Sequence, residues 1–454
     1  MLFTTRWLSS IFTDFNRNTD EPIAIEEVFT DSRVQVKNAL FVPIIGENFD
    51  GHHYLKQAIA NGAVAALWNR ETSLPESLPT DFLVFYVDDT IGSLQQLATN
   101  YRDEINPIVI GITGSNGKTT TKDLVASMLK EVYETHYTNG NFNNHIGLPL
   151  TILSMPRNTQ VLVLEMGMSD FGEIDLLSKI ATPDHVMITN IGESHIEHLG
   201  SREGIKEAKM EITNGMKTDG LVFIDGDEPL LKDIHKQKNC ITCGFREDND
   251  VIIQNVDVRL NHTNFQLADG NAYMVPLLGK HHALNAALAI ALGERLGVNS
   301  ERRKNALLSL QQTGMRFEMV RGMNDASIIN DAYNASPTSM KAAIDVVKQM
   351  DGFVEKVLIL GDVLELGEHS EEMHRSVASH IDAPITAILT YGDEAAYISE
   401  AVKENNPSLY CSHFHSKEEL IYALQPYLKR ESLLLFKASR GLQFESFINE
   451  IIHP

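Results

Sequence analysis

The stretch from Gly111 to Thr121 has the residue types of a phosphate-binding loop: Gly-Ile-Thr-Gly-Ser-Asn-Gly-Lys-Thr-Thr-Thr. It follows an apolar run at 108–112 and precedes apolar residues at helical spacing, so we expect it to join a strand to a helix. Glycines let successive backbone N–H groups point at phosphate oxygens, and the helix N-terminus adds partial positive charge. The nucleotide-binding residues expected from this loop are Gly114, Ser115, Asn116, Gly117, Lys118, Thr119 and Thr120.

Lys118 and Thr119 are the residues of this loop that would act on a nucleotide most directly. The lysine is expected to reach the β- and γ-phosphates, and the threonine hydroxyl to ligate Mg²⁺. The strict pattern has a glycine five residues before Gly117, where this chain has Ile112. The loop is therefore a variant, and a glycine-rich turn without a ligand is the competing interpretation.

Glu165 and Lys209 are two further candidates for chemistry. Glu165 ends an apolar run, and a carboxylate at the end of a strand beside a phosphate loop commonly binds Mg²⁺. A glutamate in isolation there is more often a surface residue. Lys209 falls in a predicted helix, where exposure statistics favour a solvated side chain.

The elements that must position these residues alternate between strands and helices. Short apolar runs at 108–112, 161–164, 186–189 and 221–224 are separated by helical patterns. This alternation indicates a mostly parallel α/β sheet. Ligands of such sheets bind at the carboxyl ends of the strands, which is where the candidate residues fall.

Length and composition limit the class of protein. A chain of 454 residues corresponds to about three domains. The 38 basic and 61 acidic residues give a net charge of −23, which argues against a nucleic-acid partner because phosphate backbones require a basic face. No apolar run approaches the roughly 18 residues of a membrane span. The cysteines number only three, which agrees with a reducing compartment, so we expect a cytoplasmic protein and interpret Cys240 and Cys243 as structural.

The variant loop, Thr113-Gly-Ser-Asn-Gly-Lys-Thr-Thr120, resembles the ATP loop of the Mur ligases, which build the peptide of bacterial peptidoglycan. The segment Asn330-Asp-Ala-Tyr-Asn-Ala-Ser-Pro-Thr-Ser339 resembles Asp-Asp-x-Tyr-Asn-Ala-x-Pro-x-Ser, typical of the members that add D-alanyl-D-alanine. Other segments resemble the family in the same order along the chain: Asp31-Ser-Arg33, Thr138-Asn-Gly-Asn-Phe-Asn-Asn-His-Ile-Gly-Leu-Pro-Leu150, Asn190-Ile-Gly-Glu-Ser-His195, Leu278-Gly-Lys-His-His-Ala-Leu-Asn285, Met315-Arg316 and Lys437-Ala-Ser-Arg440.

This resemblance implies a set of metal ligands. His195 matches the second metal ligand of the family, and Lys209 matches a lysine that the family carbamylates. A carbamate forms on a neutral amine and is an anionic oxygen ligand for Mg²⁺. Thr119, Glu165, His195 and carbamylated Lys209 would therefore hold one or two Mg²⁺ ions.

The resemblance also implies nucleotide contacts outside the loop. Asn285 would bind adenine, because its amide offers both a donor and an acceptor. Arg316 would reach the γ-phosphate from the third domain, Asp331 would hold ribose or phosphate, and Tyr333 would stack near adenine. The implied catalytic residues are Lys118, Lys209, Glu165, His195 and Arg316.

The resemblance also implies a set of substrate-binding residues. Ser32 and Arg33 would contact the uracil or diphosphate of a UDP group, since a planar guanidinium binds two phosphate oxygens at once. The asparagine-rich stretch 138–150 would face substrate and ATP, although it would form a loop in any protein. The implied substrate-binding residues are Ser32, Arg33, Asn141, Asn143, Asn144, Asn334 and Ser339.

Three α/β domains are expected from the same resemblance. Residues 1–100 would bind the UDP-muramyl substrate, and residues 101–313 would bind ATP through a P-loop ATPase-like, mostly parallel sheet. Residues 314–454 would form a Rossmann-like domain that closes on ATP and binds the dipeptide. The sequence departs from the family pattern at His282, Asn330 and Ala438. We expect Ala438 to matter little unless its backbone needs a positive φ.

The function implied is that of an ATP-dependent amide ligase, which joins D-alanyl-D-alanine to UDP-N-acetylmuramoyl-tripeptide through an acyl phosphate. ATP and Mg²⁺ would be required, the partners would be these small molecules, and the protein would be a cytoplasmic monomer. Two alternatives remain open: another amino-acid ligase of the Mur or folylpolyglutamate type, and a P-loop ATPase or kinase. A kinase would not need the N-terminal Asp31-Ser-Arg33 segment, which disfavours the second alternative.

Overall fold

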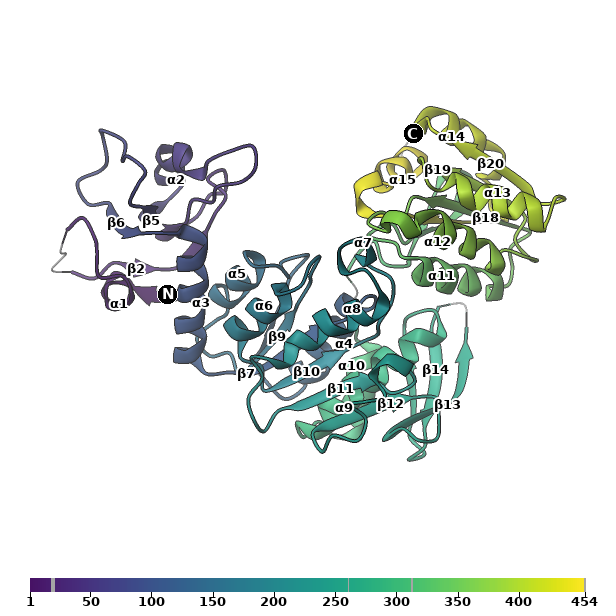
Figure 1. Cartoon of the computed structure of the whole chain (residues 1–454), viewed down its shortest axis with the longest axis horizontal. Helices are drawn as coiled ribbons and strands as arrows, with labels where there is room; N and C mark the ends of the chain where they lie inside the picture. The colour runs from purple at the N-terminus through teal and green to yellow at the C-terminus, as the bar shows by residue number, and fades with distance from the viewer. Residues whose placement is uncertain (18–20, 260, 312, 453–454) are drawn as a thin grey trace.

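Three α/β domains, each built around its own main β-sheet, follow one another along the chain (Figure 1). The computed structural model describes residues 1–17, 21–259, 261–311 and 313–452. In Figure 1 the N-terminal domain, in purple and blue, lies on one side of the teal central domain, and the C-terminal domain, which ends in yellow, lies on the other. The predicted α/β fold class with three domains is confirmed.

The N-terminal domain packs its helices on a parallel sheet of order β3-β4-β5-β6. Phe41 and Trp68 are buried in its core. Asp89 caps the N-terminus of α3, the helix that leads into the central domain. The elements are β1 (Phe3–Thr4), α1 (Thr5–Ile11), β2 (Ala24–Ile25), β3 (Glu27–Phe29), β4 (Ala39–Phe41), α2 (Leu55–Ala60), β5 (Ala63–Asn69), β6 (Leu83–Val87) and α3 (Thr90–Ile105).

The central domain contains a nine-stranded sheet of order β15-β14-β13-β12-β11-β10-β7-β9-β8. Its elements are β7 (Ile108–Thr113), α4 (Lys118–Lys130), β8 (Thr135–Tyr137), α5 (Gly147–Leu153), β9 (Val161–Glu165), α6 (Glu173–Ala181), β10 (His185–Ile188), α7 (Ile196–Leu199), α8 (Arg202–Met210), β11 (Leu221–Asp225), β12 (Cys240–Gly244), β13 (Val251–Val258), β14 (Thr263–Leu267), β15 (Ala272–Val275), α9 (Lys280–Arg295) and α10 (Ser300–Leu308).

The four predicted apolar runs correspond to β7, β9, β10 and β11. Alternate residues of β9 enter different core clusters, Leu162 and Leu164 in one and Val161 and Val163 in the other. Both faces of the sheet are therefore covered, which explains why these strands are apolar throughout. Neighbouring strands are parallel from β13 to β8, so the mostly parallel sheet is confirmed.

The last two strands at one end of the sheet, β14 and β15, run antiparallel and were not predicted. In β14 buried and half-buried residues alternate. This period of two is typical of a strand with one covered face, and it does not produce the continuous apolar run that identified the other strands.

The C-terminal domain has a six-stranded sheet of order β16-β17-β21-β18-β19-β20, in which only the edge strand β16 is antiparallel among the described pairs. Ser336 and Ser339 form a capping box at the start of α11. The elements are β16 (Glu318–Arg321), β17 (Ser327–Asn330), α11 (Pro337–Gln349), β18 (Glu355–Gly361), α12 (Ser370–Val377), β19 (Ala387–Tyr391), α13 (Ala396–Asn405), β20 (Tyr410–Phe414), α14 (Lys417–Leu424), β21 (Ser432–Lys437) and α15 (Glu445–Ile452).

The cysteines and the helices bear on two earlier expectations. Cys240 and Cys243 lie in β12 as free thiols, and burial raises the pKa of both, which disfavours the reactive thiolate. Their structural interpretation is supported. Within the described ranges, no helix is long and apolar enough to cross a membrane.

Candidate active site

A cavity of about 1160 Å³ lies at the carboxyl ends of the central strands, where the C-terminal domain faces them. It gathers most of the predicted site residues from segments far apart in the sequence. Those that line it are Ser115, Asn116, Gly117, Lys118, Thr119, Thr120, Asn141, Asn143, Asn144, Glu165, His195, Asn285, Arg316, Asp331, Tyr333, Asn334 and Ser339. Gly114, Lys209, Ser32 and Arg33 are predicted site residues outside this lining.

Two glycines give the phosphate loop its shape. Gly114 has φ 151° and Gly117 has φ 78°, a region that L-residues with a Cβ rarely adopt. A Cβ on Gly114 would lie 1.8 Å from Thr189 Oγ1, so no other residue fits there. Helix α4 begins at the next residue after Gly117, which presents its N-terminal N–H groups to the cavity as a site for phosphate.

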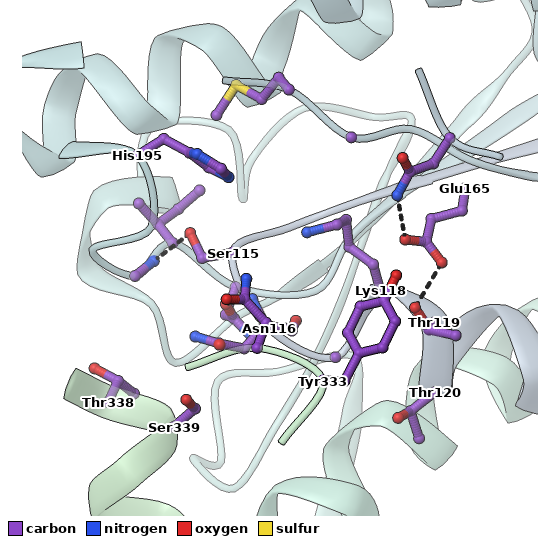
Figure 2. Close-up of a pocket in the computed structure, with 18 of the residues that line it drawn as sticks. Ser115, Asn116, Lys118, Thr119, Thr120, Glu165, His195, Tyr333, Thr338 and Ser339 are labelled. Atoms are coloured by element: carbon purple, nitrogen blue, oxygen red, sulfur yellow. Dashed lines mark hydrogen bonds between the residues drawn. The ribbon is translucent and has the colours of Figure 1, made fainter. Parts of the chain in front are cut away.

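The loop after β10 holds the phosphate loop in place. The backbone N–H groups of Ser115 and Asn116 donate to the carbonyl and the side-chain oxygen of Asn190, at 3.1 and 2.9 Å. In return, Gly192 N–H donates to Ser115 Oγ at 2.8 Å, the dashed line beside Ser115 in Figure 2. Asn190 begins one of the segments that resemble the family, but no role was predicted for it, although an asparagine just after a strand was a usable signal.

Lys118 is only partly buried, and its ammonium donates to the carbonyl of Gly114 at 2.8 Å. Desolvation lowers its pKa and nearby Arg316 lowers it further, while Glu165 opposes both. Lys118 and Arg316 therefore concentrate positive charge in a partly desolvated space, where a phosphoryl group would be attracted strongly.

Glu165 is 2% exposed at the end of β9 and has both oxygens engaged. Oε2 accepts from Thr119 Oγ1 at 2.7 Å, and Oε1 accepts from Asn143 Nδ2 at 2.8 Å (Figure 2). A hydroxyl and a carboxylate side by side next to a phosphate loop are the hard oxygen ligands that Mg²⁺ prefers. The residues present thus fit a magnesium ion bound with the nucleotide.

Lys209 lies on α8 with 1% of its surface exposed. The prediction of a solvated side chain, which exposure statistics favoured, is therefore wrong. Desolvation lowers its pKa well below the usual value, and the charge of Lys118 lowers it further. Among the described residues it forms no ion pair with a carboxylate. Both effects favour the neutral amine, which is the form that can add CO₂.

His195 adopts φ 64° just before α7 and pairs through Nδ1 with Glu365 of the C-terminal domain. This hydrogen bond lowers the pKa of Glu365. Figure 2 shows His195 well apart from Thr119 and Glu165. In the part of the chain that the structure describes, no three His, Cys, Asp or Glu side chains are grouped closely enough to hold a metal.

The C-terminal domain reaches the phosphate loop directly. Ser336 Oγ donates to Asn116 Oδ1 at 3.1 Å, and the Arg316 guanidinium lies 4.1 Å from the centre of the Tyr333 ring. Asp331 is held by an ion pair with Lys437 at 2.6 Å. The predicted residues of the third domain thus line the same cavity as the loop.

Ser32 and Arg33 lie in the N-terminal domain, away from the cavity. Ser32 is buried and donates to Gln57 Oε1 at 3.2 Å, whereas Arg33 is exposed and pairs with Asp31 at 2.7 Å. The Asp31 carboxylate binds the Nε and Nη2 edge of the guanidinium, so a diphosphate at that edge would have to replace this exposed pair.

Asp225 lines the same cavity and was missed. It ends β11, and burial together with the charges of Asp227 and Glu228 raises its pKa to about 7. Glu228 also lines the cavity and pairs with Arg202 at 2.8 Å. The rule that selected Glu165, a carboxylate at the end of a buried strand, applied equally to Asp225.

The three departures from the family pattern are all accommodated. His282 is buried, which lowers its pKa well below the usual value, and the adjacent His281 lowers it further. Asn330 ends β17 and accepts from Ala332 N–H at 3.3 Å. Ala438 is buried and is not among the residues with positive φ, so a methyl group fits where glycine is usual.

Comparison with known families matches nearly the whole chain. Residues 24–102 match the model described as Mur ligase family, catalytic domain; residues 112–293 match the Mur ligase middle domain; and residues 315–440 match the Mur ligase, glutamate ligase domain. The chain belongs to the Mur ligase family. An unrelated P-loop ATPase or kinase, one of the two alternatives, is therefore wrong.

Individual proteins that are similar to this chain carry more specific names than the family. The chain is 46% identical to the UDP-N-acetylmuramoyl-tripeptide–D-alanyl-D-alanine ligase of Bacillus subtilis over 434 residues, which cover 95% of this chain and 94% of that one. MurF of Acinetobacter baumannii superposes with a TM-score of 0.87 at 29% identity, covering 100% and 99% of the chains. MurF ligase of Thermotoga maritima, solved in complex with ADP, has a TM-score of 0.79 at 28% identity, covering 94% and 96%.

Proposed function

We propose that this protein joins D-alanyl-D-alanine to UDP-N-acetylmuramoyl-tripeptide at the expense of ATP, giving the UDP-muramyl pentapeptide, ADP and phosphate. The observation that carries the proposal is the cavity that places Lys118, the Thr119–Glu165 pair and Arg316 of another domain around one space. The 46% identity to a ligase of this name over 95% of the chain supports the particular substrates.

The residues that line the cavity are suited to a reaction in two steps. The terminal carboxylate of the tripeptide attacks the γ-phosphorus, the bond to the β-phosphate oxygen breaks, and ADP leaves with that electron pair. The amine of the dipeptide then adds to the acyl phosphate, loses a proton and expels phosphate from a tetrahedral intermediate. Lys118 and Arg316 stabilise the negative charge that develops on the transferring phosphoryl oxygens.

Mg²⁺ is part of the proposal because its ligands are suited to it. Thr119 and Glu165 would hold one ion with the nucleotide, and His195 together with a carbamate on Lys209 would hold a second ion. A bound Mg²⁺ supplies charge neutralisation for the phosphates. Asn143, which donates to Glu165, orients this carboxylate toward Thr119.

The remaining nucleotide contacts are proposed for residues at the rim of the loop. Asn285 lies against Gly117, since a Cβ added to Gly117 would come within 3.0 Å of the Asn285 amide nitrogen. The Asn285 side chain is therefore suited to contact the nucleotide just beyond the phosphates. Asp331 and Tyr333 also line the cavity, with Asp331 suited to ribose hydroxyls and the Tyr333 ring to stacking.

A second cavity of about 400 Å³ adjoins the first, and we place the dipeptide there. Asn141, His195, Tyr333 and Asn334 line both spaces, so an acceptor in the second can reach an acyl phosphate in the first. Arg440 would bind the acceptor carboxylate. The apolar walls of the second cavity, suited to the two methyl groups, include Ala335, Val363 and Leu364.

The domain roles are proposed accordingly. Residues 1–100, with Ser32 and Arg33, would hold the UDP end of the muramyl substrate, residues 101–313 would hold ATP, and residues 314–454 would hold the dipeptide. Asn144 and Ser339 would contact substrate within the cavity. A monomer in the cytoplasm is part of this proposal, and free thiols together with the use of ATP support the cytoplasmic location.

Product analysis tests this proposal. The protein is incubated with ATP, Mg²⁺, the UDP-muramyl tripeptide and D-alanyl-D-alanine, and the products are identified by mass spectrometry. We expect a new compound with the mass of the tripeptide substrate plus the dipeptide less one water, and none when ATP or either substrate is omitted. Equal or better incorporation of a single amino acid would contradict the proposal and favour another ligase of the family.

Arg316→Ala is expected to lower kcat by roughly 10²-fold with a much smaller effect on ATP affinity. The arginine comes from the C-terminal domain and meets the phosphate when charge develops on it, so its loss is felt mainly in the transition state. Steady-state kinetics and calorimetric titration of ATP measure the two quantities. Arg321→Ala, on the exposed edge strand β16, is the matched control, and a change confined to the KM for ATP would contradict this role.

A further inference from the structure

The phosphate-loop helix is tied to the segment that carries Arg316. Asp123 lies on α4, five residues after Lys118, with a side chain that is 6% exposed. Its Oδ2 accepts hydrogen bonds from both the backbone N–H and the hydroxyl of Thr313, at 3.1 and 2.9 Å. Residues 313–317, which we call the linker, connect the central domain to β16.

The other oxygen of Asp123 has a different partner. Oδ1 forms an ion pair of 2.5 Å with Lys122, whose side chain is 1% exposed. A buried carboxylate is costly unless its oxygens are paired. The ion pair neutralises the charge, and the second oxygen accepts the two hydrogen bonds from Thr313. Hydrogen bonds to a charged acceptor are the stronger kind, and two of them hold both the backbone and the side chain of Thr313.

The far end of the linker is held by the C-terminal domain. Met315 O accepts from Tyr333 N–H at 3.3 Å, and Phe317 N–H donates to Asp331 Oδ1 at 3.2 Å. Met315 and Phe317 have φ of 61° and 52°, which residues other than glycine keep only where their surroundings impose it. Arg316 therefore projects into the cavity from a segment that is held at both ends.

We propose that Thr313, bound by Asp123, is a positioning residue that sets Arg316 against the phosphate loop. Three residues of chain span at most about 10 Å, so the anchor limits how far the Arg316 backbone can move from α4. Lys118 and Thr119 begin that same rigid helix, and the anchor thus sets the arginine relative to the residues that hold the phosphates. The inference rests on the proposed function, in which Arg316 acts on the γ-phosphate.

Thr313→Val tests the anchor because valine has the shape of threonine without its hydroxyl. We expect kcat to fall about tenfold while the affinity for ATP and the thermal midpoint stay unchanged. Thr313→Ser, which keeps the hydroxyl, should restore most of kcat. Thr218→Val, at an exposed threonine of the same domain, is the matched control. Asp123→Asn is less suitable, because it leaves the Lys122 charge buried without its partner.

A double-mutant cycle with Arg316→Ala shows whether the effect passes through the arginine. In the Arg316→Ala background, Thr313→Val should change kcat less than twofold, because the group that the anchor positions is already absent. A tenfold loss in both backgrounds, or no loss in either, would overturn the inference. Failure of the unmodified protein to form the amide product would instead contradict the proposed function.

Discussion

Replacement of Lys118 by alanine is expected to lower kcat by about 10³-fold and to leave the fold intact. The ammonium lies in the cavity beside Glu165 and Arg316, and its one hydrogen bond to a described residue is to the carbonyl of Gly114. The Lys118 ammonium therefore contributes little to the free energy of unfolding. Its charge, in contrast, faces the position that the phosphoryl group would occupy, where stabilisation of developing charge contributes directly to the rate.

The measurement pairs single-turnover kinetics with thermal unfolding. Lys130→Ala, at the exposed C-terminal end of the same helix, controls for the loss of a lysine from α4 and should retain full activity. If Lys118→Ala turned over at a rate near that of the unmodified protein, the loop would have no part in the chemistry.

Lys209→Ala is expected to be nearly inactive, with a loss of roughly 10³-fold, and to be partly restored by a small carboxylate such as acetate. The side chain is buried, and burial together with the charge of Lys118 lowers its pKa well below the usual value, which favours the neutral amine that can add CO₂. The carbamate would supply anionic oxygens for Mg²⁺. Added acetate can enter the space that alanine leaves and present equivalent oxygens.

Two comparisons separate carbamylation from packing. Lys209→Met keeps the apolar stem and fills the space, so it should be inactive and insensitive to acetate. Lys206→Ala, on the same helix and paired with Asp233 at 2.6 Å, should remain active. Native mass measurement of the unmodified protein should show the mass of one CO₂, lost on CO₂ depletion. An active Lys209→Ala variant and an unmodified lysine would together exclude this chemistry.

The parts that could be predicted from the sequence were those encoded in contiguous residues. The glycine and lysine spacing around Lys118 identified the loop, and apolar runs identified the strands whose ends carry it. Glu165 was found because a carboxylate at the end of such a strand is a local pattern.

The parts that could not be predicted depend on what packs against a residue. Lys209 reads as an exposed helix lysine, since a sequence does not show which face of a helix another domain element will cover. The anchor between Asp123 and Thr313 joins residues far apart in the chain, with no pattern in either segment. Asn190 and Asp225 lie at strand ends like Glu165, and a uniform search of such ends would have included them.

Phosphate release from ATP, measured with each combination of muramyl peptide and acceptor, tests the central claim most directly. We predict rapid release with UDP-N-acetylmuramoyl-tripeptide and D-alanyl-D-alanine together, matched mole for mole by the pentapeptide product, and little release with either alone, with single amino acids or with folate substrates. Comparable release in the absence of a muramyl tripeptide, or with a single amino acid in place of the dipeptide, would contradict the account.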